Sequence, residues 1–269
     1  MSVKSVLDII RSRAPGKEPR VGIVLGSGLG SFVDLVEDQT IISYDDLPDF
    51  PNAGVQGHVG QLVLGKVYRA EVAILQGRAH YYEKGHADAM RTPIHTLKEL
   101  GCDLLILTNA AGSLVHKAKP GSIMLLTDHI NFTGVSPLFK ETESSRFVDM
   151  VDAYDPMLCN QFRDAALSKG ITLHEGVYIW FCGPSFETSA EIKVAKNLGA
   201  QVVGMSTVPE VILARFFGLK VAALSIITNM AAGMSKVALS HEQTMGNANY
   251  AAHDLQSLLG EFLSNYENS

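Results

Sequence analysis

GPSFETSAEIKVAKNLGAQVVGMSTVPE, which spans residues 183–210, contains two predicted helix starts separated by a short apolar run. Thr188 with Glu191 fits the capping box, in which an N-cap hydroxyl and a glutamate three residues later satisfy each other's backbone N–H groups. Thr207 with Glu210 fits the same pattern. A helix, a buried strand and a second helix are therefore expected in this order, which is typical of an α/β sheet.

Four side chains of this stretch lie at loop or strand ends that open into the predicted helices: Phe186, Glu187, Met205 and Ser206. Ligands of α/β sheets bind at this edge, where strands end and helices begin. The stretch therefore predicts the fold class and also the place of a binding site.

The length and composition allow one large α/β domain or two small ones, and because no linker is visible we expect one domain over residues 1–269. Hydrophobic residues make up 46% of the chain, which is enough to bury a sizeable core. The net charge of −6 comes without a basic stripe, which argues against a nucleic-acid or anionic-membrane partner. We expect no signal peptide and no membrane span, because no apolar stretch has the required length without charges.

The cysteines favour a cytoplasmic protein. Cys102, Cys159 and Cys182 are an odd number and form no C-x-x-C motif. This usage suits a reducing compartment, and we expect all three to be small, buried, free thiols.

Helix and strand patterns alternate along most of the chain. Helices are expected over residues 3–10, 92–100 and 156–169, and from a capping box at Ser240 and Gln243 to the closing apolar residues near Phe262. The expected strands are 21–25, 41–44, 62–68, 71–75, 104–107, 123–126, 177–181 and 221–227. This alternation predicts a single three-layer α/β/α domain with a central mixed β-sheet.

Several connecting segments carry polar or small residues. Residues 26–31 form a glycine-rich loop after a strand, which fits an anion-binding turn and a plain tight turn about equally well. Residues 76–86 contain Arg78, His80 and two tyrosines, a combination that favours a functional loop. Residues 108–113 read as a second small-residue turn. We also expect a long irregular segment over 132–155 and a mobile loop over 233–239.

Six motifs occur in an order that closely resembles the trimeric purine nucleoside phosphorylases of the nucleoside phosphorylase family. They are Gly26–Gly30, Gly77–Glu83, Thr108–Gly112, Gly183–Thr188, Gly204–Glu210 and Thr228–Asn229. The resemblance covers nearly the whole chain and implies a phosphorylase/hydrolase-like fold. It also implies a reaction in which a ribosyl or deoxyribosyl group moves from a purine to inorganic phosphate, as in purine salvage.

The resemblance assigns residues to each part of such a site. It implies that phosphate is bound by Ser27, Arg78, His80, the backbone N–H of Ala110, Ser206 and His58. It implies that the purine is bound by Phe186, Glu187 and Asn229, and the sugar by Tyr82, Met205, His241 and Phe147. The residues with implied catalytic roles are Asn229, Glu187, His80 and His241. Phe147 matches an aromatic residue that closes the neighbouring subunit's site, which implies a homotrimer.

The implied base-binding pair favours 6-oxopurines such as hypoxanthine and guanine. Glu187 would accept a hydrogen bond from the ring N1–H, which adenine lacks, and Asn229 would donate to the oxygen at C6 or to N7. The related methylthioadenosine phosphorylases carry Asp at the position of Asn229. No cofactor and no metal ion are expected, because phosphate is a co-substrate and no histidine pair has metal-site spacing.

Two other classes compete with this interpretation. A nucleoside hydrolase would use water in place of phosphate, but it typically needs an Asp-rich calcium site, which the sequence lacks. A non-catalytic nucleotide-binding module would not require Glu187, Asn229 and the phosphate-binding residues together.

Overall fold

The structure, a computed structural model, describes residues 3–51, 59–235 and 241–266, except the side chains of 241–251. Nine strands of the described chain form one mixed sheet in the order β2-β3-β4-β1-β5-β8-β7-β6-β9. The strands are β1 Val21–Leu25, β2 Glu37–Ser43, β3 Gln61–Val67, β4 Ala70–Gln76, β5 Leu104–Ser113, β6 Ile123–Asn131, β7 Leu173–Trp180, β8 Val202–Gly204 and β9 Lys220–Met230. The predicted hairpin of residues 62–75 is confirmed by the antiparallel pairing of β3 with β4.

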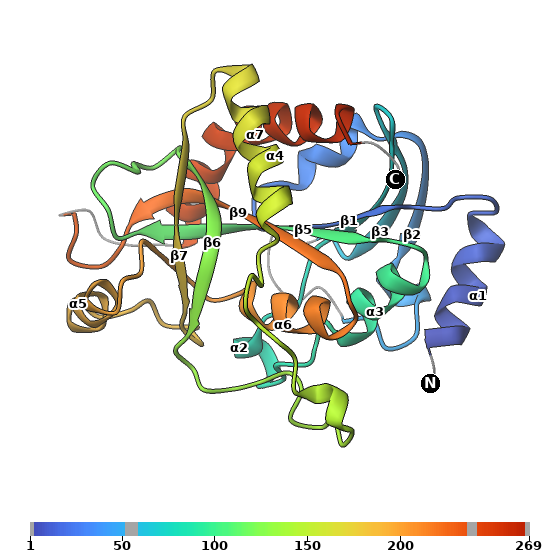
Figure 1. Ribbon diagram of the computed structural model, residues 1–269, viewed down its shortest axis with the longest axis horizontal. Coiled ribbons are helices and arrows are strands. Elements are labelled where there is room, and N and C mark those ends of the chain that lie inside the picture. The colour runs from blue at the N-terminus through green and yellow to red at the C-terminus, as the bar shows by residue number, and fades with distance from the viewer. Residues whose placement is uncertain (1–2, 52–58, 236–240, 267–269) are drawn as a thin grey trace.

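Helices cover both faces of this sheet, so the predicted α/β/α layering with a central mixed sheet is confirmed. In Figure 1, α4 and α7 lie on one face, and α2, α3 and α6 lie on the other. The α-helices are α1 Val3–Arg13, α2 Tyr81–Lys84, α3 Arg91–Glu99, α4 Pro156–Lys169, α5 Ser189–Asn197, α6 Val208–Phe216 and α7 His241–Ser264. The 3-10 helices are η1 Gly30–Leu35, η2 Tyr44–Asp46 and η3 Ser144–Arg146.

One half of the sheet closes on itself, which the sequence does not reveal. Strand β5 pairs with β8 and also with β9, and the path from β8 through β7 and β6 returns to β9. Five strands therefore form a small closed barrel, and β1 to β4 continue from it as an open sheet.

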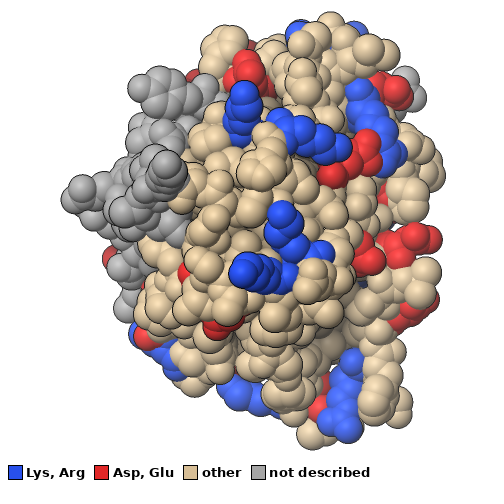
Figure 2. All heavy atoms as spheres, turned by 90° about the vertical axis from the view of Figure 1, so that its left-hand side faces the viewer, with Lys and Arg blue, Asp and Glu red and all other residues tan. Residues whose placement is uncertain are grey.

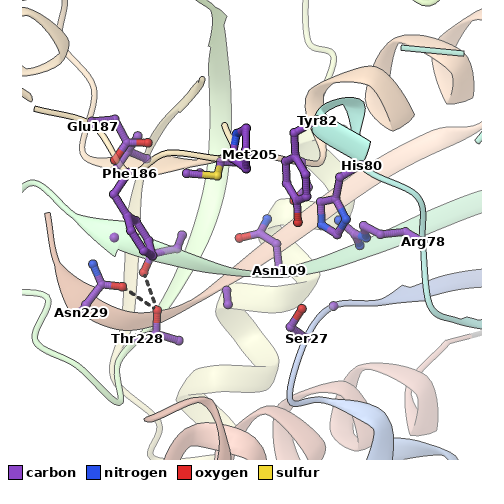
Figure 3. Close-up of a pocket in the computed structure, with 18 residues that line it drawn as sticks. Ser27, Arg78, His80, Tyr82, Asn109, Phe186, Glu187, Met205, Thr228 and Asn229 are labelled. Atoms are coloured by element: carbon purple, nitrogen blue, oxygen red, sulfur yellow. Dashed lines mark hydrogen bonds between the residues drawn. The ribbon is translucent and has the colours of Figure 1, made fainter. Parts of the chain in front are cut away.

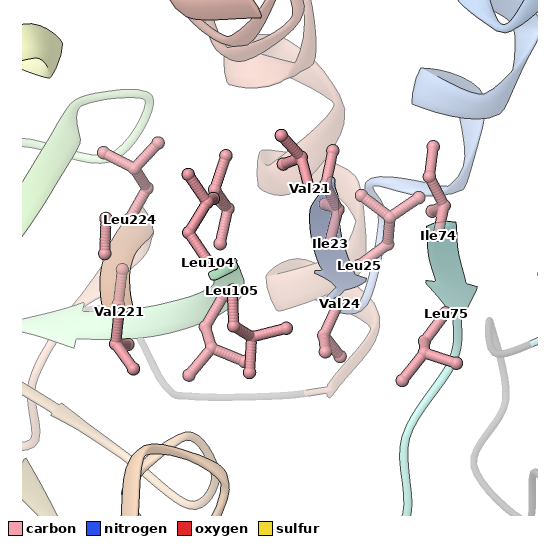
Figure 4. Close-up of a cluster of buried hydrophobic side chains, with 14 of the residues drawn as sticks. Val21, Ile23, Val24, Leu25, Ile74, Leu75, Leu104, Leu105, Val221 and Leu224 are labelled. Carbon is pink, nitrogen blue, oxygen red and sulfur yellow. The ribbon is translucent and has the colours of Figure 1, made fainter. Parts of the chain in front are cut away.

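The core lies on both faces of the central strands. All five residues of β1 are buried, and β1 pairs in parallel with β4 and β5. Figure 4 shows Ile23 and Leu104 pointing to one side of the sheet while Val24 and Leu105 point to the other. Burial on two faces explains why these strands are continuous apolar runs in the sequence and not alternating ones.

The structure corrects the sequence predictions for two strand ends and one cysteine. Residues 108–113, predicted as a turn, are the second half of β5, because they pair in parallel with β9 up to Met230. Strand β6 likewise continues through residues 127–131 along β7. Cys182 is exposed, whereas Cys102 and Cys159 are buried as expected, and all three are free.

Of the three predicted capping boxes, one is confirmed, one is wrong and one lies outside the described residues. The Thr188 hydroxyl accepts a hydrogen bond from the Glu191 backbone N–H at 3.2 Å, and the Glu191 carboxylate accepts from Thr188 N–H at 2.7 Å. Thr207 makes no side-chain cap, and its φ is +73°. Its hydroxyl contacts other segments of the chain instead, so a tertiary contact has replaced the local one. The capping box predicted at Ser240 lies outside the described residues.

The segment over residues 132–155 is irregular, as predicted, and contains only η3 among the elements defined above. The loop predicted over 233–239 lies partly outside the described residues. Among the helices that the structure describes, none is long and apolar enough to cross a membrane. Figure 2 shows Lys and Arg side chains interspersed with Asp and Glu on the described part of one face.

The N-terminus of α4 provides a test of the local structure. The Asp155 carboxylate accepts hydrogen bonds from the backbone N–H groups of Met157 at 2.9 Å and Leu158 at 3.0 Å. We expect Asp155→Ala to lower the free energy of unfolding by about 1 kcal/mol, measured by urea unfolding. Asp155→Asn retains the acceptor and should stay close to the unsubstituted protein; equal losses in both variants would contradict the capping role.

Candidate active site

A cavity of about 300 Å³ opens where β5, β8 and β9 meet the loops that follow β1, β4 and β7. Ten of the thirteen residues predicted from the sequence line it: Ser27, Arg78, His80, Tyr82, Ala110, Phe186, Glu187, Met205, Ser206 and Asn229. His58 and the side chain of His241 lie outside the described residues. The structure thus brings together residues that are as far apart in the chain as Ser27 and Asn229.

The cavity has two chemically different ends. In Figure 3, Ser27, Arg78 and His80 lie at one end, and Phe186 and Asn229 lie at the other, with Glu187 above them. Tyr82 and Met205 lie between the two ends. A positive charge and hydroxyl groups therefore face one half of the cavity, and an acid–amide pair with an aromatic ring faces the other.

Gly26 allows the first loop to approach β5 closely. Its backbone N–H donates to the Thr108 hydroxyl at 3.0 Å. A Cβ atom at position 26 would lie only 2.7 Å from the Thr108 carbonyl oxygen and 2.8 Å from Asn109 Cα. Only glycine fits this approach without displacing backbone atoms, and the approach places Ser27 at the cavity wall.

Arg78 is the most deeply buried charged group of the cavity, with 1% of its surface exposed. One terminal nitrogen donates to the Thr108 carbonyl oxygen at 2.6 Å. The other donates to the Thr207 hydroxyl at 3.3 Å and lies 3.3 Å from the Glu210 carboxylate. A buried charge is tolerated only with such partners, so these contacts fix both the position and the orientation of the guanidinium.

His80 is oriented by Glu83. The Glu83 carboxylate accepts a hydrogen bond from the His80 backbone N–H at 2.6 Å and lies 3.2 Å from the ring Nδ1. The His80 side chain also accepts from the Glu83 backbone N–H, as in a capping box. The His80 ring stacks on Tyr82, with ring centroids 4.8 Å apart. Burial raises the pKa of Tyr82 to about 12, so its phenol is neutral.

At the opposite end, Asn229 has a fixed orientation. Its side-chain oxygen accepts from the Thr228 hydroxyl at 2.9 Å, and its amide nitrogen donates to the Met230 carbonyl at 3.1 Å. An amide nitrogen carries two hydrogens, so Asn229 can make a second donation. The Glu187 side chain is largely buried, and the loss of hydration raises its pKa.

Sequence reasoning missed Asn109, which lines the same cavity. Asn109 is 2% exposed, and its amide nitrogen donates to the Thr207 hydroxyl at 2.9 Å. The motif Thr108–Gly112 pointed to this region, but we predicted a turn in which only the Ala110 backbone mattered. A polar side chain inside a buried strand was the available signal, since such residues are uncommon without a partner.

Phe147 does not line the cavity and is 79% exposed. The guanidinium carbon of Arg146 lies 5.1 Å from the centre of its ring. The segment that carries Phe147 is fixed to α3, because Glu141 accepts from Arg91 Nε at 2.7 Å. The role of Phe147 in a neighbouring subunit stays a prediction.

Comparison with known proteins identifies relatives of the whole chain. Residues 20–264 match the profile of the phosphorylase superfamily. Over 247 residues the chain is 41% identical to purine nucleoside phosphorylase 1 of Geobacillus stearothermophilus. This match covers 91% of this chain and 90% of the relative.

Solved structures of a Schistosoma mansoni purine nucleoside phosphorylase have the same fold. The complex with inosine has a TM-score of 0.92 and 34% identity, and the match covers 99% of this chain and 97% of that chain. The complex with adenosine has a TM-score of 0.92 and 35% identity, with coverages of 99% and 98%.

Proposed function

The chain belongs to the phosphorylase superfamily and is an enzyme of the purine nucleoside phosphorylase type, and from this premise we propose that it acts on 6-oxopurine nucleosides. Inorganic phosphate attacks the anomeric carbon, the bond between this carbon and the purine nitrogen breaks, and the products are the free base and a pentose 1-phosphate. The observation that supports this proposal is the cavity itself, which has a guanidinium and hydroxyl groups at one end and an acid, an amide and an aromatic ring at the other.

Phosphate binds at the end that contains Arg78. The guanidinium supplies a fixed positive charge, and the hydroxyls of Ser27 and Ser206 supply neutral donors. His80, oriented by Glu83, contacts the same anion, and the backbone N–H of Ala110 completes the set. His58 is proposed here as a further contact on the basis of the resemblance alone.

The purine binds at the opposite end, between Phe186, Glu187 and Asn229. Glu187 accepts a hydrogen bond from N1–H, and Asn229 donates to N7 or to the oxygen at C6. The second of these contacts stabilises the negative charge that develops on the departing ring. Phe186, 40% exposed, offers an aromatic face for stacking.

Adenosine is the poorer substrate in this proposal. Its base has no N1–H, so the largely buried Glu187 carboxylate would face a ring acceptor and lose a hydrogen bond. The Schistosoma relative has been solved with adenosine as well as inosine. Binding of a base therefore does not decide the preference, and turnover has to be compared.

The sugar lies between the two ends, against Tyr82 and Met205. We further propose that His241 contacts the sugar hydroxyls and that Phe147 closes the site of a neighbouring subunit in a homotrimer. The proposed reaction requires no cofactor besides phosphate. We also propose that the enzyme serves purine salvage, because the reaction yields free purine bases, and that it works in the cytoplasm.

One assay separates this function from its alternatives. The protein is incubated with inosine in the presence and absence of phosphate, and the release of hypoxanthine is followed. Phosphate-dependent release is expected. Release that does not need phosphate would indicate a hydrolase, and binding of inosine without release would indicate a non-catalytic module.

Asn229→Asp should change the base preference. A carboxylate cannot donate to the oxygen at C6 but can accept from the 6-amino group of adenine, so inosine turnover should fall and relative adenosine turnover should rise. The measurement is kcat/KM for both nucleosides at saturating phosphate. An unchanged ratio of the two values would remove Asn229 from the base-binding pair.

Removal of the Arg78 charge should weaken phosphate binding. The single variant Arg78→Ala would leave the Glu210 carboxylate buried without a partner, so the double variant Arg78→Gln, Glu210→Gln is the better test. We expect the phosphate KM to rise roughly tenfold or more, which corresponds to ~1.4 kcal/mol. Glu210→Gln alone keeps the cation and a side-chain oxygen that can accept from it, and serves as the control. A double variant with an unchanged phosphate KM would argue against Arg78 as an anion ligand.

The raised pKa of Glu187 should appear in the pH dependence of inosine binding. A protonated carboxyl group no longer accepts N1–H as a carboxylate does, so binding is strongest above the raised pKa and is lost as the pH falls through it. The inosine KM at saturating phosphate should therefore rise toward acid pH. Glu187→Gln has nothing to titrate and should lose this acidic limb. Glu191→Gln, at an exposed capping glutamate, should keep it.

A further inference from the structure

Thr207 has a backbone conformation that β-branched residues rarely adopt. Its φ is +73° and its ψ is −52°, and the Val208 N–H donates to the Ser206 carbonyl at 2.8 Å. These values define a classic γ-turn, which is a strained conformation. Glycine would adopt it without strain. A threonine at this position is therefore expected to make side-chain contacts that offset the backbone strain.

The Thr207 hydroxyl joins three residues of the cavity wall. It accepts a hydrogen bond from the Asn109 amide nitrogen at 2.9 Å and one from the Arg78 guanidinium at 3.3 Å. It also lies 3.1 Å from the Ser206 hydroxyl, where either oxygen could be the donor. Thr207 itself is fully buried.

The number of protons on a hydroxyl decides the direction of the last bond. A hydroxyl oxygen has two acceptor sites and one proton. The Asn109 amide nitrogen and the Arg78 guanidinium nitrogen can only donate, so they occupy both acceptor sites of the Thr207 hydroxyl. The single Thr207 proton is then donated to the Ser206 oxygen.

Ser206 is thereby left with its own proton to donate. Its oxygen already accepts from Thr207, and its backbone N–H donates to the Tyr178 hydroxyl at 3.2 Å, which anchors the residue. Ser206 lines the cavity at the end where phosphate is proposed to bind. An oxyanion there offers the strongest acceptor for the Ser206 proton.

We propose that Thr207 is a positioning residue that orders this chain of hydrogen bonds. The donors Asn109 and Arg78 direct the Thr207 proton to Ser206, and Ser206 in turn directs its proton to the oxyanion. Each bond in such a chain polarises the next one and strengthens it. The inference rests on the proposed function, because it takes inorganic phosphate as the anion that Ser206 contacts.

Two substitutions at position 207 separate the hydroxyl from the shape of the side chain. Thr207→Val keeps the branched shape and removes the hydroxyl, whereas Thr207→Ser keeps the hydroxyl and removes the methyl group. We expect Thr207→Val to raise the phosphate KM about tenfold and to leave the inosine KM within about threefold. Thr207→Ser should keep the phosphate KM within about threefold.

A matched control is Thr96→Val. Thr96 is also fully buried, but it lies on α3 and does not line the cavity. The same chemical change there should leave the phosphate KM unaltered. A purely structural effect at position 207 would move the melting temperature, kcat and both KM values together and would not single out phosphate.

Thr207→Gly provides a second variant in case valine prevents folding. Glycine relieves the strained φ, which offsets part of the stability lost with the buried hydroxyl, and this variant should still show the raised phosphate KM. A phosphate KM that stays unchanged in the valine or glycine variant would overturn the inference. An equal rise of the phosphate KM in the serine and valine variants would also overturn it.

Phosphate binding can also be measured without turnover, by the rise in melting temperature on titration with inorganic phosphate alone. Suppose that the unsubstituted protein shows this rise but does not cleave inosine. The proposed function then fails. The inference is still supported if phosphate no longer raises the melting temperature of Thr207→Val but does raise that of Thr207→Ser. If the unsubstituted protein shows neither turnover nor a phosphate-induced rise, both are overturned.

Discussion

The buried contact between Arg78 and its partners holds one end of the cavity together. A guanidinium with 1% exposure would be strongly destabilising unless its charge were offset, and the Glu210 carboxylate lies 3.3 Å away. The Thr108 carbonyl and the Thr207 hydroxyl also accept hydrogen bonds from this guanidinium. Since these partners come from β5 and from the start of α6, the contact fixes the relative positions of three segments that are distant in sequence. Glu210 formally balances the positive charge of Arg78. An anion bound here would therefore depend on oriented N–H and O–H donors as well as on attraction to the guanidinium. Such a balance suits a group that must bind, react and leave.

The other end of the cavity is built on different elements and is more open. Its residues Phe186, Glu187 and Asn229 follow β7 or lie near the end of β9, and the capping box of α5 holds the backbone just after Glu187. The hydroxyl of Thr228 donates to the side-chain oxygen of Asn229 and so fixes the orientation of this amide. The two ends are therefore attached to strands of one continuous sheet, whose closed half has no free edge that could shift. This arrangement sets the separation between the charged end of the cavity and the end that contains Asn229, as the proposed displacement at the anomeric carbon would require.

Ordered contacts also reach the irregular segment over residues 132–155. Glu141 accepts from Arg91, and the Arg91 guanidinium lies 5.2 Å from the centre of the Phe217 ring. Lys140 donates to the Asp88 carboxylate at 2.7 Å. The segment is thus held against α3 and α6 even though it has little regular structure of its own. It presents Phe147, exposed, at the surface.

The sequence by itself determined the features that depend on local patterns. Runs such as Val21–Leu25 are apolar on both faces and predict buried strands, and Thr188 with Glu191 predicts a helix start, because these preferences act between neighbours along the chain. The ordered motifs also identified ten residues that line the cavity.

Only the tertiary structure decided what depends on distant partners. The closure of β5 onto β9, the continuation of β5 through Asn109, and the loss of the expected cap at Thr207 all follow from contacts between segments about a hundred residues apart. A hydroxyl bonds to whichever donors the fold brings within reach, and at Thr207 those donors are Asn109 and Arg78, not the first turn of its own helix.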